Sequence, residues 1–318
     1  MPKILIPDSY IALVPKLPFE IVHFSAKGPV TEGLDAEALV VWRIGNAVLH
    51  PLISSMPNLK WIQTLAAGVD HVLGAPKLPK DFILSNGSNL HCAPTAELGV
   101  TLLLSAVRQL HRWRDLQHQG TWDRGAYNKQ MEGKDLNTLE DSKVLILGMG
   151  TIGLEMAHRL KSFGAIVEGI ASSAGVREGF MTHAVKDLLD VVPTADAIIS
   201  VLPETPETCG ILSRELINKM QPHAWLVNIG RGSALDEAAL IDALKQKRIA
   251  GAALDVTAQE PLPKESPLWA LENLIISPHV AGGGQRFYAK AAELLQHNAQ
   301  AFVAGKPLAN LIDPQKGY

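Results

Sequence analysis

The chain has 318 residues, and its 29 basic and 32 acidic side chains give a formal net charge of −3 at pH 7. That length suits two domains of roughly 150 residues each, and 47% apolar against 19% charged residues excludes a disordered chain. The near balance of charge argues against a nucleic-acid-binding stripe and against a helix that lies on a membrane surface.

The sequence predicts neither a membrane span nor a leader. The longest strongly apolar run, Leu98–Val107, is far shorter than the roughly 18–20 residues of a membrane helix. The N-terminal sequence MPKILIPDSY lacks the basic and apolar regions of a signal peptide. Cys92 and Cys209 have neither CxxC nor zinc spacing, so we expect no disulfide framework, no metal site and a cytoplasmic protein.

Short apolar runs alternate with loop or helical segments in the first hundred residues. Each run is closed by Pro, Gly, Asn or a charge, which is typical of strands buried in a parallel sheet. A long amphipathic stretch from about Pro94 to Gln119 then predicts one helix with Pro94 in its first turn. The predicted strands are Lys3–Ile6, Ile21–Phe24, Leu39–Trp42, Trp61–Leu65 and Phe82–Ser85.

From Ser142 onward the alternation of strand and helix is clearer, and it predicts a doubly wound parallel sheet. Helices are expected after Gly150, ending at Gly164, and over Ser213–Met220 and Asp236–Lys247. The tail from about Gln285 is helical, and we expect it to fold back onto the first domain. The predicted strands are Lys143–Leu147, Ile166–Ile170, Ala197–Leu202, Trp225–Ile229, Ala250–Val256 and Leu274–Ile276.

A glycine-rich segment follows the strand Lys143–Leu147 and opens a helix. Glycines in this context permit a tight turn and the close approach of a pyrophosphate to the helix N-terminus. The segment therefore predicts dinucleotide binding. Its residues are Gly148, Met149, Gly150, Thr151, Ile152 and Gly153.

The next strand lacks the acid that would hold the ribose hydroxyls of NAD about 20 residues further on. Ala171 stands there, followed by Ser172 and Ser173 and, later, Arg177. Two hydroxyls and an arginine suit a 2′-phosphate, so the sequence favours NADP. An NAD site without the acid remains the alternative.

Three later strand ends carry Arg231, Glu260 and His279. Arginine binds a 2-oxo carboxylate through two parallel hydrogen bonds. Histidine exchanges the proton that accompanies hydride transfer, and a carboxylate beside it orients the ring. Each residue alone has an ordinary structural explanation, such as a surface ion pair, a solvated loop acid or an interior histidine. Together, beside a dinucleotide loop, they predict a hydride-transfer site.

These motifs resemble the family of D-isomer-specific 2-hydroxyacid dehydrogenases, which includes D-lactate, D-glycerate and 3-phosphoglycerate dehydrogenases and glyoxylate/hydroxypyruvate reductases. The resemblance covers nearly the whole chain. It rests on LGMGTIG (Leu147–Gly153), LPETPET (Leu202–Thr208), VNIGRGSALDEAAL (Val227–Leu240), LDVTAQEPLP (Leu254–Pro263), SPHVAGG (Ser277–Gly283), LAAGVDHV (Leu65–Val72) and TAELGVTLLL (Thr95–Leu104).

The resemblance implies that Arg231 binds the substrate carboxylate and carbonyl, that His279 is the acid/base, and that Glu260 hydrogen-bonds the imidazole. Backbone amides at Ala67 and Gly68 would bind the substrate carboxylate. Asp255 would receive the nicotinamide carboxamide. Further residues expected to line the cofactor are Leu202, Pro203, Thr208, Ile229, Gly230 and Ala281.

The same resemblance implies a Rossmann dinucleotide-binding domain over residues 102–289. It would be inserted in a smaller flavodoxin-like α/β substrate-binding domain made of residues 1–101 and 290–318. A homodimer through the cofactor domain is expected.

Some positions depart from the family's pattern. Thr257-Ala258 stand where Phe-Glu is common, and Gly284 and Arg286 stand where Thr and Glu are common. Arg43 could contact a substrate's distal group or be a surface charge. Trp269 could line the pocket mouth or pack in the core.

The leading hypothesis is an NAD(P)H-dependent oxidoreductase that interconverts a small 2-oxo acid and its D-2-hydroxy acid. The alternative is a dinucleotide-sensing corepressor on the same fold.

Overall fold

The computed structural model describes residues 1–14, 16–125, 128 and 136–315, and it divides the chain into two compact units. Unit 1 comprises residues 1–91 and 283–318, and unit 2 comprises residues 92–282. The predicted domain boundaries after 101 and after 289 fall inside helices α3 (Ser88–Val107) and α10 (Phe287–Val303). Residues 316–318 of the predicted substrate-binding domain lie outside the described residues.

Unit 1 is built on a parallel five-stranded sheet with the order β2-β1-β3-β4-β5. This is the flavodoxin-like order, whose ligand site lies at the switch point between the first and third strands. The strands are β1 (Lys3–Pro7), β2 (Glu20–Phe24), β3 (Ala38–Val41), β4 (Trp61–Thr64) and β5 (Ile83–Ser85). Beside α3 and α10, the helices are η1 (Asp8–Leu13), α1 (Asn46–Ser54) and α2 (Asp70–Leu73).

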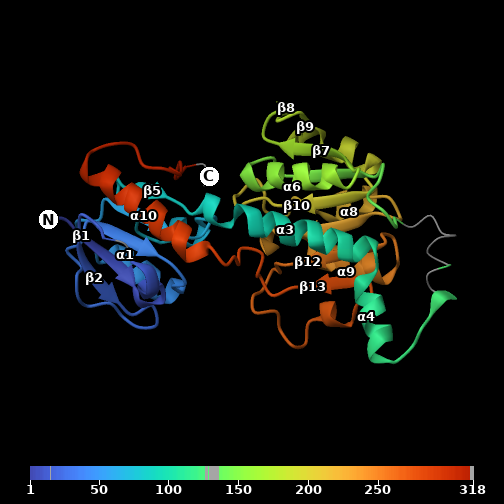
Figure 1. Cartoon of the computed structure of the whole chain (residues 1–318), viewed down its shortest axis with the longest axis horizontal. Helices are drawn as coiled ribbons and strands as arrows, with labels where there is room; N and C mark the ends of the chain where they lie inside the picture. Colours follow the sequence, from blue (N-terminus) through green and yellow to red (C-terminus); the bar gives the residue numbers. More distant parts are fainter. Residues whose placement is uncertain (15, 126–127, 129–135, 316–318) are drawn as a thin grey trace. The chain divides into compact units, whose positions relative to one another are not determined.

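The C-terminal helix α10 packs on the sheet of unit 1, as the sequence predicts. Phe287, Ala291, Leu295 and Ala299 form one cluster with fully buried strand residues such as Trp61. Figure 1 shows α10 lying across the strands of this unit. Removing this apolar helix face from water stabilises the sheet, at roughly 25 cal/mol per Å² of buried apolar area.

Unit 2 contains the larger sheet, with the order β13-β12-β11-β10-β6-β7-β9-β8. All neighbours are parallel except β8 and β9, so the predicted doubly wound parallel sheet is confirmed. The strands are β6 (Lys143–Leu147), β7 (Ile166–Ala171), β8 (Gly175–Arg177), β9 (Phe180–Ala184), β10 (Ala197–Ser200), β11 (Trp225–Asn228), β12 (Gly251–Leu254) and β13 (Leu274–Ile276).

Helices cover both faces of this sheet and make two apolar cores. One core contains residues of α3 and α6, and the other contains residues of α7, α8 and α9. The helices are α4 (Leu110–His118), α6 (Thr151–Ser162), α7 (Leu188–Val191), α8 (Arg214–Lys219) and α9 (Glu237–Lys245), with short turns η2 (Val185–Asp187), η3 (Val192–Thr194), η4 (Gly232–Ala234) and η5 (Pro267–Ala270).

The single helix predicted over Pro94–Gln119 is wrong. α3 begins at Ser88, with Pro94 in its interior, and ends at Val107, while α4 starts at Leu110. Gln109 between them has φ +52°, a left-handed conformation that ends the first helix. The sequence carries no Gly or Pro at this break. The apolar periodicity therefore gave no sign of it.

α3 is also longer than its apolar run suggests. Among the described helices it alone is long and apolar enough to cross a membrane: it has 20 residues, and 56% of its apolar 18-residue stretch is buried inside the protein. Ala96, Leu103 and Ala106 are fully buried. Buried core helices of globular proteins can have the same length and composition, so these features are weak evidence for a membrane span.

Candidate active site

The glycine loop joins β6 to α6, and two close backbone approaches shape it. Gly148 has φ +104°, and a Cβ at Gly153 would lie 1.9 Å from the carbonyl oxygen of Gly148. Only glycine permits this contact of helix on strand end. Gly150 is the N-cap of α6, has no side-chain cap, and has no atom within 4 Å of its Cβ position. Such an open helix N-terminus fits a pyrophosphate. The other loop residues are Met149, Thr151 and Ile152.

Arg177, at the end of β8, lies against the glycine loop. Its Nη1 donates to the Met149 carbonyl oxygen at 3.3 Å, and its Nη2 donates to the Ser173 hydroxyl at 3.2 Å and carbonyl oxygen at 3.4 Å. Ala171 ends β7, and Ser172 and Ser173 follow it as exposed residues. The structure therefore brings Arg177 and Ser173 together beside the loop, with no carboxylate at position 171.

The loops that follow β10 and β11 touch each other. A Cβ at Gly230 would lie 2.5 Å from the carbonyl oxygen of Leu202, so glycine is required for this approach. The Thr208 hydroxyl donates to the Pro203 carbonyl oxygen at 2.6 Å and accepts from the Thr205 N–H at 2.9 Å. These bonds close the 203–208 loop and fix the residues predicted to line the cofactor.

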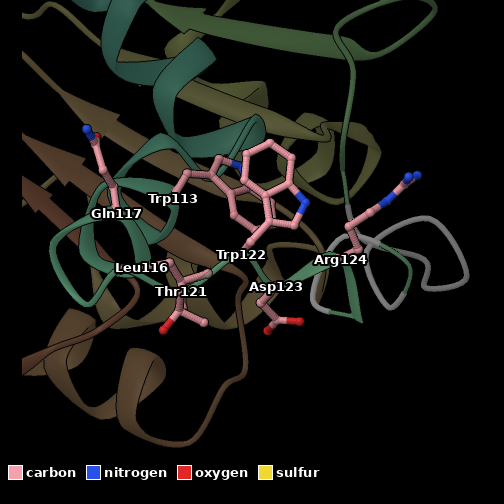
Figure 2. A pocket seen from close by; sticks show the side chains of 8 residues that line it. Trp113, Leu116, Gln117, Thr121, Trp122, Asp123 and Arg124 are labelled. Atoms are coloured by element: carbon pink, nitrogen blue, oxygen red, sulfur yellow. The ribbon is translucent and has the colours of Figure 1, made fainter.

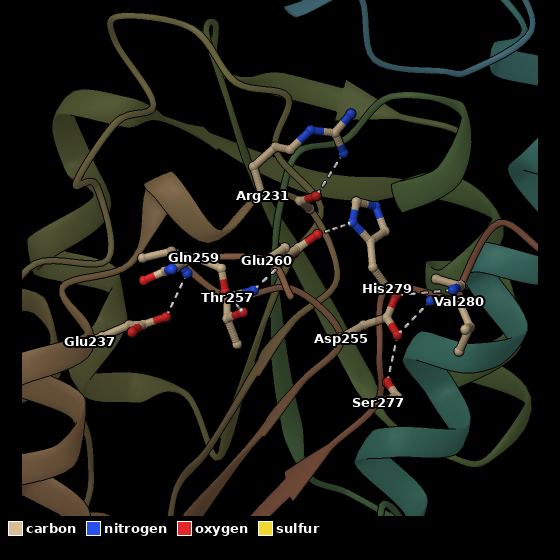
Figure 3. Close-up of polar contacts among 12 residues, drawn as sticks. Arg231, Glu237, Asp255, Thr257, Gln259, Glu260, Ser277, His279 and Val280 are labelled. Atoms are coloured by element: carbon tan, nitrogen blue, oxygen red, sulfur yellow. Dashed lines mark hydrogen bonds and ion pairs between the residues drawn. The ribbon is translucent and has the colours of Figure 1, made fainter. Parts of the chain in front are cut away.

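A buried asparagine holds the main chain around Arg231. Asn228 ends β11 and is fully buried. Its Nδ2 donates to the Arg231 carbonyl oxygen at 2.9 Å, and its Oδ1 accepts from the Gly230 N–H at 3.2 Å. Ile229, between them, points into the core. The Arg231 side chain is half-buried and donates from Nη1 to the Gly230 carbonyl oxygen at 2.9 Å (Figure 3).

His279 and Glu260 form a close pair. His279 Nδ1 lies 2.7 Å from Glu260 Oε2, and the other carboxylate oxygen accepts from the Thr257 N–H at 3.1 Å. With the carboxylate ionised, Nδ1 carries the donated proton, and Nε2 is left to face a ligand. Both side chains are partly exposed, at 46% for His279 and 36% for Glu260. Figure 3 shows the imidazole and the carboxylate pointing toward each other.

Asp255 holds the backbone that carries His279. Its carboxylate is buried, with Oδ1 accepting from the Ser277 hydroxyl at 2.5 Å and the Val280 N–H at 3.0 Å, and Oδ2 accepting from the Ala281 N–H at 2.9 Å. The His279 N–H donates to the Asp255 carbonyl oxygen at 2.8 Å. His279 has φ +51°, a conformation that costs a non-glycine residue about 1–3 kcal/mol. The bonds to Asp255 offset this cost.

Sequence reasoning missed Glu237, the first residue of α9. Its Oε1 accepts from the Ala258 N–H at 2.6 Å, in the turn that carries Glu260 (Figure 3). Gly232 packs against the same turn, since a Cβ there would lie 1.9 Å from the Thr257 carbonyl oxygen. An acid at a helix start is normally explained by the helix dipole. The sequence therefore gave no reason to expect that Glu237 binds the turn that carries Glu260.

In unit 1, the predicted residues Ala67 and Gly68 follow β4. Their backbone N–H groups have no hydrogen-bond partner among the described residues, so they are available to an anion. The turn is held by Asn86, whose Nδ2 donates to the Ala67 carbonyl oxygen at 2.7 Å. Arg43 follows the neighbouring strand β3 and is exposed.

The positions that depart from the family's pattern lie in both units and make different contacts. Thr257 and Ala258 donate to Glu260 and Glu237 through their backbone N–H groups, so these two bonds do not depend on the side chains at positions 257 and 258. Arg286 lies in unit 1, just before α10. The core alternative for Trp269 is wrong: its side chain is 55% exposed and donates to the Pro263 carbonyl oxygen at 2.9 Å.

The NAD-binding domain model of the D-isomer specific 2-hydroxyacid dehydrogenases matches residues 100–281, which is more than half of the chain. Among curated relatives, the glyoxylate reductase of Thermofilum pendens is 28% identical over 319 residues, covering 98% of this chain and 93% of that protein.

Solved structures agree with this match. A D-isomer specific 2-hydroxyacid dehydrogenase from Xanthobacter autotrophicus Py2, in complex with NADPH and MES, has a TM-score of 0.84 and 27% identity and covers 100% of this chain and 99% of that one. The NADPH-dependent glyoxylate/hydroxypyruvate reductase of Sinorhizobium meliloti, in complex with NADP and sulfate, has a TM-score of 0.83 and 26% identity, with the same two coverages.

The glycine loop, the strand-end residues and the match to the family's NAD-binding domain agree with one another. The chain therefore belongs to the D-isomer specific 2-hydroxyacid dehydrogenases and is an NAD(P)-dependent oxidoreductase.

Proposed function

We propose that the protein reduces a small 2-oxo acid to its D-2-hydroxy acid, with NADPH as the preferred cofactor. The observation that carries this proposal is the 2.7 Å pair of His279 Nδ1 and Glu260 Oε2 at the carboxyl edge of the sheet that bears the glycine loop. The reduced nicotinamide, when bound, supplies the hydride to the carbonyl carbon.

His279 enters this step as the imidazolium, with a proton on each ring nitrogen, and gives its Nε2 proton to the carbonyl oxygen as the carbon–oxygen double bond becomes a single bond; the ring is left neutral, with its remaining proton on Nδ1. Glu260 keeps the imidazole in the tautomer and orientation that this transfer needs, because it accepts the Nδ1 proton. In the oxidation direction the same nitrogen takes the hydroxyl proton. Arg231 binds the substrate carboxylate through its guanidinium and polarises the carbonyl.

The two units have different roles in this proposal. Unit 2 binds the cofactor and supplies Arg231, Glu260 and His279. Unit 1 binds the substrate through the free amides of Ala67 and Gly68. Asp255 has the further role of receiving the nicotinamide carboxamide, in addition to holding the His279 loop.

The decisive experiment compares kcat/KM for NADPH and NADH across a panel of 2-oxo acids that includes glyoxylate, hydroxypyruvate and pyruvate. We expect reduction of at least one of these acids and a lower KM for NADPH. A wild-type protein that binds the cofactor but reduces none of them contradicts the proposed reaction. A clear preference for NADH contradicts the cofactor proposal alone.

Replacing Arg177 by Ala is expected to raise the KM for NADPH about 10-fold or more, because hydrogen bonds to a charged group contribute roughly 1.5–3 kcal/mol. The effect on NADH should be much smaller, since NADH has no 2′-phosphate. Steady-state kinetics with both cofactors measure this. Arg177→Lys should keep part of the preference, because it keeps the charge. Equal losses for both cofactors would show that Arg177 only supports the Met149 carbonyl.

Glu237→Ala is expected to lower kcat about 10-fold, because the turn that presents Glu260 loses its bond from Ala258. KM for the 2-oxo acid should change less than kcat, since Glu237 acts on this turn through its bond to the Ala258 backbone. Glu237→Gln keeps an accepting oxygen and should restore most of the rate. If the Ala and Gln variants lose the same activity, the hydrogen bond is not the cause.

We also propose a homodimer through unit 2, in the cytoplasm. Helix α4 buries no residue, and Trp122 beyond it is 92% exposed. Figure 2 shows the pocket that Trp113, Leu116 and Trp122 line, and none of the predicted site residues line it. Apolar surface of this kind is typically covered by a partner. Sedimentation as a monomer at micromolar concentration would contradict the dimer.

A further inference from the structure

The turn over residues 65–68 carries the free amides of Ala67 and Gly68, and we call it the amide turn. The residues that follow β5 hold it from one side. The Ala66 carbonyl oxygen accepts from the Gly87 N–H at 2.8 Å. The Ala67 carbonyl oxygen accepts from Asn86 Nδ2 at 2.7 Å. Because a trans peptide points its N–H away from its C=O, these two bonds direct both free amides to the opposite side of the turn, where one anion can bind them together.

Asn86 and Gly87 lie close against the amide turn. A Cβ at Gly87 would lie 2.3 Å from the Leu65 carbonyl oxygen, so only glycine permits this approach. Asn86 is 5% exposed, and its Oδ1 accepts from the Ser88 N–H at 3.2 Å. Since the oxygen of this side-chain amide is bound to Ser88, its NH₂ group is the one that faces the Ala67 carbonyl. The contacts therefore fix the orientation of the Asn86 amide.

The C-terminal segment, residues 309–312, holds the backbone of Asn86. The Asn86 N–H donates to the Asn310 carbonyl oxygen at 3.0 Å, and Asn310 Nδ2 donates to the Asn86 carbonyl oxygen at 3.2 Å. The Ile312 N–H donates to the Leu84 carbonyl oxygen at 2.9 Å, so the segment also pairs with β5. Asn310 has φ +54°, a left-handed conformation that asparagine adopts more readily than most residues.

Two fully buried amides join the C-terminal segment to helix α10 and to the sheet. Asn298, on α10, accepts from the Ala309 N–H at 2.8 Å and donates from Nδ2 to Gln63 Oε1 at 2.8 Å. Gln63, on β4, donates from Nε2 to the Asn86 carbonyl oxygen at 3.3 Å. The other buried residues of α10 are apolar, so packing alone does not account for Asn298. A buried polar network whose members are all paired is rigid and specifies one arrangement.

We propose that Asn86 and Asn298 are positioning residues, through which the C-terminal segment directs the amide turn at the substrate carboxylate. This inference rests on the proposed function, because that function assigns the carboxylate to the two free amides. Every contact in the network lies within unit 1. The two asparagines act on the turn through hydrogen bonds, and neither supplies a group to the reaction.

The test separates substrate binding from folding. We would measure kcat and KM for the 2-oxo acid that the wild type reduces best, the KM for NADPH and the melting temperature in Asn86→Ala, Asn298→Ala and two controls. Asn58→Ala removes an exposed asparagine of unit 1, whose Nδ2 donates to the Asp35 carbonyl oxygen at 3.2 Å. Phe24→Leu weakens the core at β2, the edge of the sheet opposite β5.

Asn86→Ala should raise the KM for the 2-oxo acid about 10-fold and keep kcat within about three-fold, because the released Ala67 peptide no longer points its partner amide at the carboxylate. Asn298→Ala should raise the same KM by a smaller factor, since it acts through the C-terminal segment. The KM for NADPH should not change, because the glycine loop lies in unit 2. Asn58→Ala should leave both constants unchanged.

Phe24→Leu shows what a loss of stability alone does. A less stable protein has fewer active molecules, which lowers the apparent kcat and leaves KM unchanged. If Asn86→Ala and Asn298→Ala behave like Phe24→Leu, the two asparagines only stabilise the fold and the proposal is wrong. A raised KM for the 2-oxo acid at an unchanged KM for NADPH supports it.

Binding distinguishes this inference from the reaction itself. If the wild type reduces no 2-oxo acid, the proposed reaction is wrong, and melting temperatures with NADP and increasing glyoxylate then replace the rates. A midpoint about 10-fold higher in Asn86→Ala than in the wild type supports the positioning role without the reaction. Equal midpoints in the two proteins, or no stabilisation of the wild type by glyoxylate, overturn the positioning role.

Discussion

Replacing His279 by Asn is expected to lower kcat by roughly 10²- to 10⁴-fold, the range for loss of a positioned general acid. Asparagine keeps a polar side chain of similar size but has no group that gives a proton at neutral pH. The KM for NADPH should stay near its wild-type value, because the glycine loop and Arg177 are untouched. Initial rates, with cofactor affinity from NADPH fluorescence, measure both quantities.

A matched control exists in the same unit. His223 Nε2 lies 2.7 Å from Asp196 Oδ1, the same separation as in the His279–Glu260 pair. Asp196 and His223 precede β10 and β11, at the amino edge of the sheet, where no ligand is expected. His223→Asn should therefore keep kcat within a few-fold of the wild type. If His279→Asn also kept its kcat, another group would have to supply the proton.

The Glu260 partner gives an intermediate case. Glu260→Gln still accepts from the Thr257 N–H but holds the imidazole through a neutral group, which weakens the bond to Nδ1. We expect a smaller loss of kcat than in His279→Asn, and no further loss when both substitutions are combined. Residues that act as one unit are non-additive in this way.

The strands of both sheets were predictable, but the edge hairpin β8–β9 was not. In β6, for example, the four residues after Lys143 are all apolar because both faces of the strand are buried. The hairpin lies at the sheet edge, where Val176 is 68% and Met181 52% exposed, so its apolar residues form no continuous run. Arg177 on this hairpin was found through its neighbours in sequence, with no strand predicted around it.

The identities of the residues at the strand ends could also be predicted from the sequence. The contacts that hold those residues could not. A parallel sheet places Asp255 and His279 at one edge, and this follows from strand order alone. The Asp255 carboxylate accepts from two backbone N–H groups and from the Ser277 hydroxyl. These contacts depend on the left-handed conformation of His279, which is uncommon for a residue other than glycine. The contact of Glu237 with Ala258 likewise joins segments that are adjacent only in the fold.

Replacing Arg231 is expected to have the second large effect, chiefly on substrate binding. Arg231→Ala removes the two hydrogen bonds that we propose hold the substrate carboxylate. At roughly 1.5–3 kcal/mol for each charged bond, kcat/KM should fall about 10²-fold or more. Arg231→Lys keeps the charge but loses the planar, bidentate geometry, so it should recover only part of the loss. Steady-state kinetics over a wide range of 2-oxo acid concentrations separate KM from kcat.

The conformation of the loop after β11 does not depend on the Arg231 side chain, so the effect of these substitutions on substrate binding can be separated from an effect on folding. Asn228 holds the main chain through the Arg231 carbonyl and the Gly230 N–H, so both variants should fold and bind NADPH. Arg214, paired with Asp242 at 2.9 Å on the surface, provides an Arg→Ala control that should leave kcat/KM within a few-fold. If Arg231→Lys had the wild-type kcat/KM, a single positive charge would be enough to bind the substrate carboxylate. The proposed pair of parallel hydrogen bonds would then be wrong.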